Sequence, residues 1–147
     1  MRVWHTFPLL LLSLLLATLL VPGTAAAAAK KTQRVSVSSA GVQGNSTSGI
    51  NAPSVSADGR SVTFDSIASN LVPGDANGYE DVFVRDLKLH RTYLVSVSSA
   101  GVQGNSDSLT PAISGDGRYV VFNSDASNLV TGDTNDYEDV FVRGPYR

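Results

Sequence analysis

Two acidic loops hold the side chains best suited to chemistry in this sequence of 147 residues. In the first loop, Asp75, Asn77 and Asp81 offer side-chain oxygens within a short span of chain. Gly78 marks a sharp turn between them, and Glu80 provides a further carboxylate. Hard cations such as Ca²⁺ take oxygen ligands of these kinds from turns. We therefore expect Asp75, Asn77 and Asp81 to hold Ca²⁺, with Glu80 as a substitute ligand.

The second loop repeats the pattern at Asp133, Asn135 and Asp139, and Glu138 is its substitute carboxylate. A metal-free explanation stays open for both loops. Asp and Asn side chains cap nearby backbone groups, and Gly tolerates left-handed dihedral angles, so all three are common turn residues. The loops also lack the distal bidentate Glu of an EF-hand. The sequence is compatible with a calcium site and with a hydrogen-bonded turn.

The other reactive side chains do not form a catalytic set. A Ser–His–acid triad needs a positioned imidazole, and His90 is the only histidine after residue 27. Zinc sites need several Cys or His ligands, and the chain has no cysteine. The carboxylates of the two loops recur at equivalent places of a repeat, which is typical of structural turns. We predict that the chain has no catalytic residues and is not an enzyme.

An internal repeat organises the chain. Residues 35–46 and 95–106 share the identical stretch VSVSSAGVQGNS, and residues 53–85 align without a gap to residues 111–143. A period of about 60 residues indicates one supersecondary unit used twice. Units of this kind bury their apolar faces against neighbouring copies.

Each repeat is predicted to contain four short strands rich in Val, Phe, Tyr and Thr. They are expected at residues 53–57, 60–66, 81–86 and 91–99 of the first full repeat. Asp58 and Gly59 favour a tight hairpin turn between the first two strands. Helix patterns are nearly absent after residue 27, so the predicted fold class is all-β.

The third strand has apolar side chains on successive residues. Val-Phe-Val occupies residues 82–84 and again residues 140–142. Since neighbouring strand residues point to opposite faces, both faces of this strand are expected to be buried. Small four-stranded sheets that are covered on both sides, as in the blades of a β-propeller, have this pattern.

Two stretches carry a resemblance to a known family. They are PSVSADGRSVTF (residues 53–64) and PAISGDGRYVVF (residues 111–122). Both resemble the S-x-D-G-R-x-(V/I)-x-F element of TolB-type, WD-repeat-like propeller blades. The segment ASNLVPGDANGYEDVFVRDL (residues 68–87) resembles a bacterial secreted branch of that family. The resemblance implies a β-propeller, commonly of six blades. Val55 and Ile113 depart from it, because an aromatic residue is more usual there.

The strand count poses a question of completeness. The expected order is a fourth strand at residues 33–39, a full blade at residues 53–99, and three strands of the next blade at residues 111–143, within a repeat region of residues 33–147. The total equals two blades, and propellers need about four or more. Either several chains associate head to tail, three of them giving a six-bladed homotrimer, or the chain is a fragment of a longer propeller. In the first case residues 33–39 of each chain complete the last blade of a neighbour.

The N-terminus has the layout of a secretory signal peptide. Residues 1–27 combine a basic start, a leucine-rich run and a small-residue cleavage site, and residues 28–32 form a short polar leader. The apolar run is shorter than the ~20 residues that span a bilayer, so we expect export without stable membrane insertion. The location expected is extracellular or periplasmic.

Charge and surface composition restrict the partners. The formal net charge is −2, so nucleic acids are not expected partners. Protein, peptide or glycan partners are compatible with the small, polar residues of the repeated stretch at 35–46 and 95–106, which is expected to form the crossover between blades. The side chains of this crossover that could form hydrogen bonds with such a ligand are Gln43, Asn45, Gln103 and Asn105.

The resulting functional prediction is a secreted, non-catalytic β-propeller module for binding or scaffolding, with calcium-stabilised loops. An alternative interpretation is a fragment or accessory propeller of a larger extracellular enzyme such as a hydrolase. No cofactor other than Ca²⁺ is expected.

Overall fold

The computed structural model describes residues 30–146. The predicted signal peptide, residues 1–27, and the start of the predicted leader lie outside this range. A compact unit begins at Gln33. Within residues 30–146 there is no helix that is long and apolar enough to cross a membrane.

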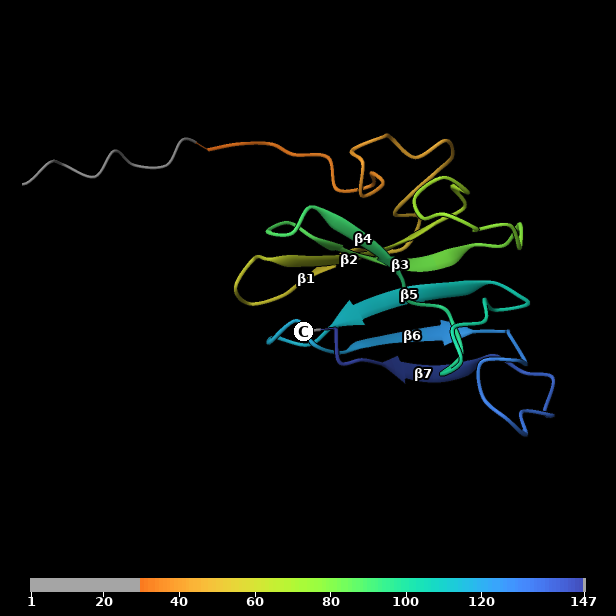
Figure 1. Ribbon diagram of the computed structural model, residues 1–147. Coiled ribbons are helices and arrows are strands. Elements are labelled where there is room, and N and C mark those ends of the chain that lie inside the picture. Colours follow the sequence, from red (N-terminus) through yellow and green to blue (C-terminus); the bar gives the residue numbers. More distant parts are fainter. Residues whose placement is uncertain (1–29, 147) are drawn as a thin grey trace, which may run out of the picture. The chain divides into compact units, whose positions relative to one another are not determined.

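The compact unit consists of two antiparallel β-sheets, so the all-β prediction is confirmed (Figure 1). The first sheet has the strand order β1-β2-β3-β4 and the second has the order β5-β6-β7. The strands are β1 (Ser54–Val55), β2 (Ser61–Ser66), β3 (Asp81–Asp86), β4 (Arg91–Leu94), β5 (Ser108–Ile113), β6 (Val120–Ser124) and β7 (Asp139–Arg143).

A tight turn joins β1 and β2 at the predicted place. Gly59 has a φ of 68°, a left-handed conformation that glycine adopts without a steric penalty. The Asp58 carboxylate accepts hydrogen bonds from the Ser56 hydroxyl at 2.6 Å and from the Arg60 amide at 3.0 Å. The Arg60 guanidinium also forms an ion pair with Asp86 at 2.7 Å. The hairpin prediction is therefore confirmed.

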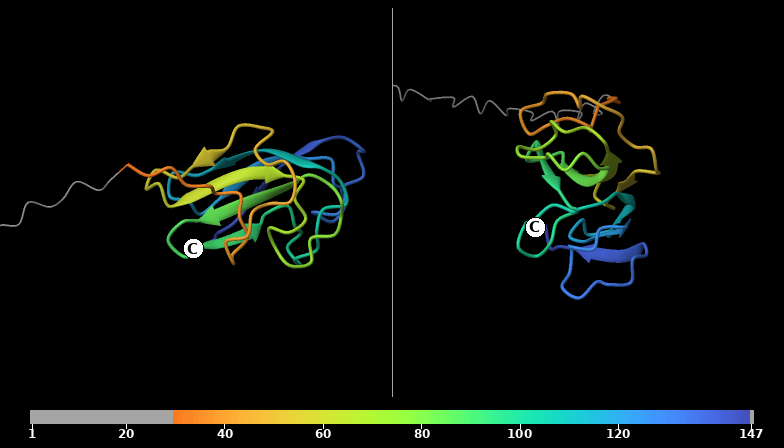
Figure 2. Two further views of the ribbon diagram at one scale, coloured as in Figure 1. Left: turned by 90° about the horizontal axis from the view of Figure 1, so that it is seen from above. Right: turned by 90° about the vertical axis from the view of Figure 1, so that its right-hand side faces the viewer.

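The first sheet buries both faces of β3, as its apolar triplet predicts. Val82, Phe83 and Val84 are each 2% exposed or less. Val82 and Val84 belong to a core cluster that includes Val120 and Phe122 of the second sheet. The two sheets therefore pack as successive layers, with β5 contacting β2 (Figure 2).

Phe83 lies on the other face of the first sheet and stacks on Phe64, with ring centroids 5.9 Å apart. Ala68 and Leu71 complete this second cluster, against which Val35 packs. Val35, in the N-terminal part of the unit, thus packs on part of the face of the first sheet that points away from the second sheet.

The second sheet differs from the prediction at its last strand. Val140 and Val142 of β7 are 70% and 67% exposed, whereas burial on both faces was expected. The reason is positional, because the face of the first sheet that contains Val82 and Val84 is covered by the second sheet. No third sheet within residues 30–146 covers the corresponding face of β7.

The predicted strand at residues 33–39 is wrong. This segment forms only an isolated bridge between Val37 and Gln43. The Val37 amide donates to the Val35 carbonyl at 2.8 Å, a three-residue turn that interrupts an extended chain. A further turn follows at Gly41, whose φ is 80°.

The same chain path recurs after β4, which ends at Leu94 rather than at the predicted residue 99. The Val97 amide donates to the Val95 carbonyl at 2.7 Å, and the turn at Gly101 repeats. The identical residues 35–46 and 95–106 therefore form the same curled crossover and not the end of a strand.

Truncation of Leu71 is expected to lower the free energy of unfolding by about 3 kcal/mol, because Leu71→Ala leaves a cavity in a packed cluster. Leu89→Ala is the matched control. Leu89 is 53% exposed, so its loss should change that free energy by less than about 0.5 kcal/mol. Urea titration measures both values. Equal destabilisation by the two variants would contradict the core assignment.

Candidate functional site

The first acidic loop connects β2 to β3 and ends at Asp81, the first residue of β3. Gly74 and Gly78 have φ angles of 79° and 75°, which allow the chain to reverse direction twice. In the second loop, Asp136 replaces Gly78 and keeps a positive φ of 59°. Asp is one of the few residues that tolerate this conformation. The sharp turn expected between the candidate ligands is present in both loops.

Asn77 organises the first loop through its side-chain amide. Its Oδ1 accepts a hydrogen bond from the Tyr79 amide at 3.2 Å, and its Nδ2 donates to Asp81 Oδ2 at 2.9 Å. A side-chain oxygen bound to the amide two residues later is the mark of an Asx turn. The amide of Asn77 thus links the loop to the start of β3.

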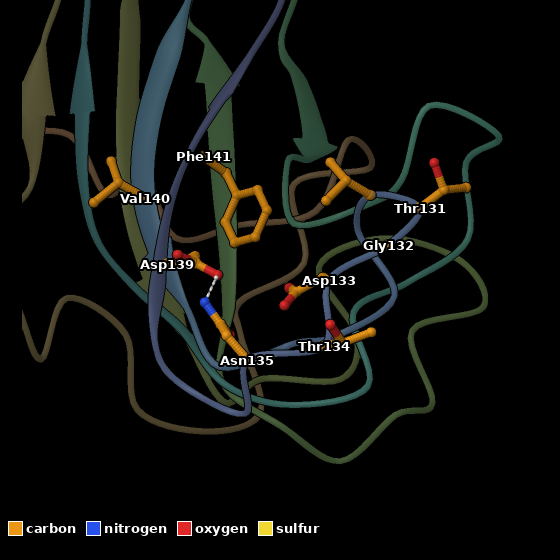
Figure 3. A pocket seen from close by; sticks show the side chains of 9 residues that line it. Thr131, Gly132, Asp133, Thr134, Asn135, Asp139, Val140 and Phe141 are labelled. Carbon is orange, nitrogen blue, oxygen red and sulfur yellow. Dashed lines mark hydrogen bonds between the residues drawn. The ribbon is translucent and has the colours of Figure 1, made fainter.

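The second loop has the same hydrogen bonds. Asn135 Oδ1 accepts from the Tyr137 amide at 3.0 Å, and Asn135 Nδ2 donates to Asp139 Oδ2 at 3.0 Å (Figure 3). Asp133 lies beside them, and Asp133, Asn135 and Asp139 line one open cavity. The structure therefore brings the predicted side chains of each loop into one neighbourhood, where they form a hydrogen-bonded turn.

The first loop is also fastened to the crossover that leads into the second sheet. The Ser96 hydroxyl donates to Asp81 Oδ1 at 2.5 Å, and Asn77 Nδ2 donates to the Gly104 carbonyl at 3.1 Å. Gln103 Nε2 lies 3.4 Å from Asp75 Oδ1. The first acidic loop thus joins its own repeat to the next one along the chain.

Burial distinguishes Asp81 from its counterpart Asp139. The Asp81 side chain is fully buried, whereas Asp139 is half-buried. Desolvation raises the pKa of Asp81 to about 6, although hydrogen bonds from Ser96 and Asn77 act in the opposite direction. Nearby negative charge on Asp75 adds to the increase. The first loop therefore contains a carboxyl group that gains a proton near neutral pH.

The two substitute ligands have different surroundings. Burial, followed by the negative charges of Asp65 and Asp107, raises the pKa of Glu80. Its Oε1 atom is buried and has no hydrogen-bond partner. Glu138 Oε1 instead accepts a hydrogen bond from Asn123 at 2.5 Å. Of the two, only Glu80 combines burial with an unsatisfied oxygen.

Metal binding by these loops stays a prediction. Across residues 30–146, no group of three or more acidic, His or Cys side chains is arranged to hold a metal ion. The amides of Asn77 and Asn135 are both engaged within their turns. The arrangement of the described residues agrees with the hydrogen-bonded alternative.

Asparagine side chains in the crossover form a second repeated arrangement. The backbone amide of Asn45 donates to Asn70 Oδ1 at 2.9 Å, and the side-chain Nδ2 of Asn45 donates to Ser69 Oγ at 3.0 Å. Asn70 Nδ2 in turn donates to the Gln43 carbonyl at 2.8 Å. The same contacts recur in the second repeat between Asn105, Ser127, Asn128 and Gln103.

Close packing lies beneath this arrangement. A Cβ atom at Gly44 would lie 3.2 Å from Ala68, and one at Gly104 would lie 3.2 Å from Ala126. The asparagines predicted to bind a ligand therefore hold each crossover against the sheet that follows it in the chain. Sequence reasoning missed this role, although the joint recurrence of Gly-Asn and Ala-Ser-Asn-Leu in both repeats was a signal for it.

His90 is exposed and lies in the turn between β3 and β4, with a φ of 55°. Comparison with models of known protein families and with curated proteins finds no match for this chain.

Protonation of Asp81 should make stability depend on pH. The pKa is about 6 in the folded chain against an ordinary 3.8, so the neutral group favours folding. This contribution is fully present below about pH 4 and is lost as the pH rises through about 6. Relative to Asp81→Asn, the wild-type free energy of unfolding should fall by up to about 3 kcal/mol between pH 4 and pH 7. Denaturant titration at several pH values measures this difference.

Asp139→Asn is the control for the pH experiment, because Asp139 occupies the same place in the second repeat but is only half-buried. This variant should leave the pH profile of the wild type nearly unchanged. An identical change of profile in both variants would contradict the assignment to Asp81.

Calcium should raise the melting temperature of the wild type above its value in chelator, since binding to the native state alone stabilises that state. Asp75→Ala combined with Asp133→Ala should abolish the increase. Differential scanning fluorimetry in calcium and in chelator measures the change. Equal melting temperatures in the two buffers would leave the hydrogen-bonded turn as the explanation.

Proposed function

We propose that this chain is an exported, non-catalytic module for binding or scaffolding, built from blades of the β-propeller type. The observation that supports it best is the contact between the two sheets. Val82 and Val84 on one face of the first sheet pack on Val120 and Phe122 of the second. Since the two sheets come from equivalent repeats, a contact between unlike faces can be repeated indefinitely, as in a radial or linear array.

The acidic side chains support the non-catalytic part of the proposal. Asn77 and Asn135 use both ends of their amides within turns, and Asp81 accepts two hydrogen bonds. Their arrangement is repeated, whereas catalysis generally requires groups with different environments and roles. Export is supported by the signal-peptide layout of residues 1–27.

A duplicated repeat tests the blade architecture. Insertion of a second copy of residues 35–94 between Leu94 and Val95 should yield a cooperative chain with a higher melting temperature, because the added sheet has a matching face on each side. Circular dichroism follows the transition. The control insert contains Val82→Asp and Val84→Asp in the added copy and should not raise the melting temperature. A less stable or aggregated chain with the unmodified insert would contradict stackable blades.

The non-catalytic part is tested on Glu80, a carboxyl group with a raised pKa and a buried oxygen that has no hydrogen-bond partner. The exported chain should hydrolyse chromogenic esters, glycosides and peptides no faster than Glu80→Gln does. Glu138→Gln is the matched control in the other repeat. Hydrolysis that disappears only in Glu80→Gln would favour an enzyme.

A further inference from the structure

The two ends of the sheet stack present unlike apolar surfaces. At one end, Val140 and Val142 of β7 are 70% and 67% exposed, although their counterparts Val82 and Val84 are 0% and 2% exposed. The difference arises because the second sheet covers the first, as described above. A sheet equivalent to β5-β6-β7 would cover Val140 and Val142 in the same way.

The other end presents the complementary surface. Ile113 of β5 packs against the cluster shared by the two sheets, and its amide lies 3.4 Å from the Ser54 hydroxyl. Its counterpart in the first sheet, Val55, is 58% exposed. The first sheet therefore exposes, around Val55, a surface equivalent to the surface around Ile113 through which the second sheet contacts the first.

The second sheet also lacks a fourth strand within the described chain. In the first sheet, β4 (Arg91–Leu94) pairs with β3 and runs directly into the crossover at residues 95–106. The identical crossover at residues 35–46 is preceded by residues 31–34, with the sequence KTQR. Residues 31–34 form no strand and are exposed. They are thus the only described segment that corresponds to β4 and is not paired in a sheet.

A threonine hydroxyl shows what the fourth strand does. Thr92 Oγ1 accepts a hydrogen bond from Arg85 Nη1 at 3.0 Å and donates one to the Val37 carbonyl. In the second sheet the equivalent arginine, Arg143, donates directly to the Val97 carbonyl at 3.0 Å. Val97 corresponds to Val37, so the hydroxyl that would lie between arginine and carbonyl is missing there.

The sequence retains that hydroxyl at the N-terminus. Thr32 corresponds to Thr92 in the repeat, and Ser99 corresponds to Ser39, whose hydroxyl accepts from the Thr92 amide at 3.0 Å. Ser99 and Arg143 line an open pocket at the edge of β7. An incoming segment with Thr32 at this place would find the same partners that Thr92 has in the first sheet.

Charge complementarity favours the same segment. Arg34 corresponds to Leu94, which lines a groove together with Val72. The counterpart of Val72 is Val130, which lines an open cavity. Asp133 and Asp139 line the same cavity (Figure 3). An arginine stem can lie along apolar surface while its guanidinium reaches a carboxylate. The basic segment and the acidic cavity are therefore matched.

We propose that the edge of β7 and the Val140–Val142 face bind a second copy of this chain. The second copy supplies residues 31–34 as the fourth strand, and its first sheet covers the face. Such a contact joins unlike surfaces, so it forms a closed ring when the rotation closes and a filament when it does not. This proposal rests on the stackable blades of the proposed function, but a monomeric module would satisfy that function without it.

Single-cysteine chains provide a direct test, because the protein has no cysteine of its own. Val84 faces Tyr93 across β3 and β4, so Val142 should face Gln33 of the second copy. Directly opposed antiparallel residues lie within disulfide range. Full-length Gln33→Cys and Val142→Cys proteins, exported, purified separately and then mixed under mild oxidation, should form a heterodisulfide several-fold faster than either forms a homodisulfide.

The control pair replaces Val142→Cys by Val102→Cys. Val102 and its counterpart Val42 are both 56% exposed, so the contact between repeats leaves this position open. Gln33→Cys mixed with Val102→Cys should form disulfides no faster than random collision does. Equal rates for the two pairs would overturn the proposal.

Native mass measured by light scattering provides the second readout. The wild-type chain should show a discrete multiple of the monomer mass, and Val140→Asp should shift it to the monomer with an unchanged far-UV spectrum. Val102→Asp should keep the wild-type mass. A monomeric wild type, or aggregation that both variants share, would overturn self-association. If the duplicated repeat still stabilises the chain in that case, the blade architecture stands and only the second copy is excluded.

Discussion

The packing of one face of the first sheet on the opposite face of the second is the contact on which the rest of the structure depends. Sheets of three or four short strands need an apolar face that is packed to be stable, and the chain has no disulfide to support them. Val82 and Val84 become buried only through this contact, and full burial of such a side chain contributes about 1.5–3 kcal/mol. Because the two faces differ, the stack has two unlike ends, and each end exposes apolar side chains that the internal contact buries.

The first acidic loop links its own repeat to the next one. Asp81 accepts hydrogen bonds from Asn77 of its own loop and from Ser96 of the following crossover. These contacts partly offset the cost of burying a carboxylate, since an unpaired charge in that position would be far less favourable. The burial that makes Asp81 a good structural link also raises its pKa. A perturbed carboxyl group thus arises here from assembly of the repeats.

Local signals predicted those elements that depend on neighbouring residues. The bounds of β3 agree with the apolar triplet and its flanking acids, and the Asp58–Gly59 turn follows from the left-handed conformation that Gly59 adopts. Residues 33–39 were misassigned because alternation of Val and Ser resembles a strand. The conformation of these residues depends on the turn at Gly41 and on contacts with β4. One such contact joins Thr92 and Val37, which are remote in sequence.

The sequence by itself determined the repeat, the all-β class and the grouping of Asp, Asn and Gly in two loops, because periodicity and turn chemistry are local properties of the chain. Only the tertiary structure decided which copy of each repeated residue is buried. Val82 and Val140 have the same neighbours in sequence, yet one is fully buried and the other 70% exposed. Burial depends on what lies across the sheet, and two identical segments at different places in a stack have different layers beside them.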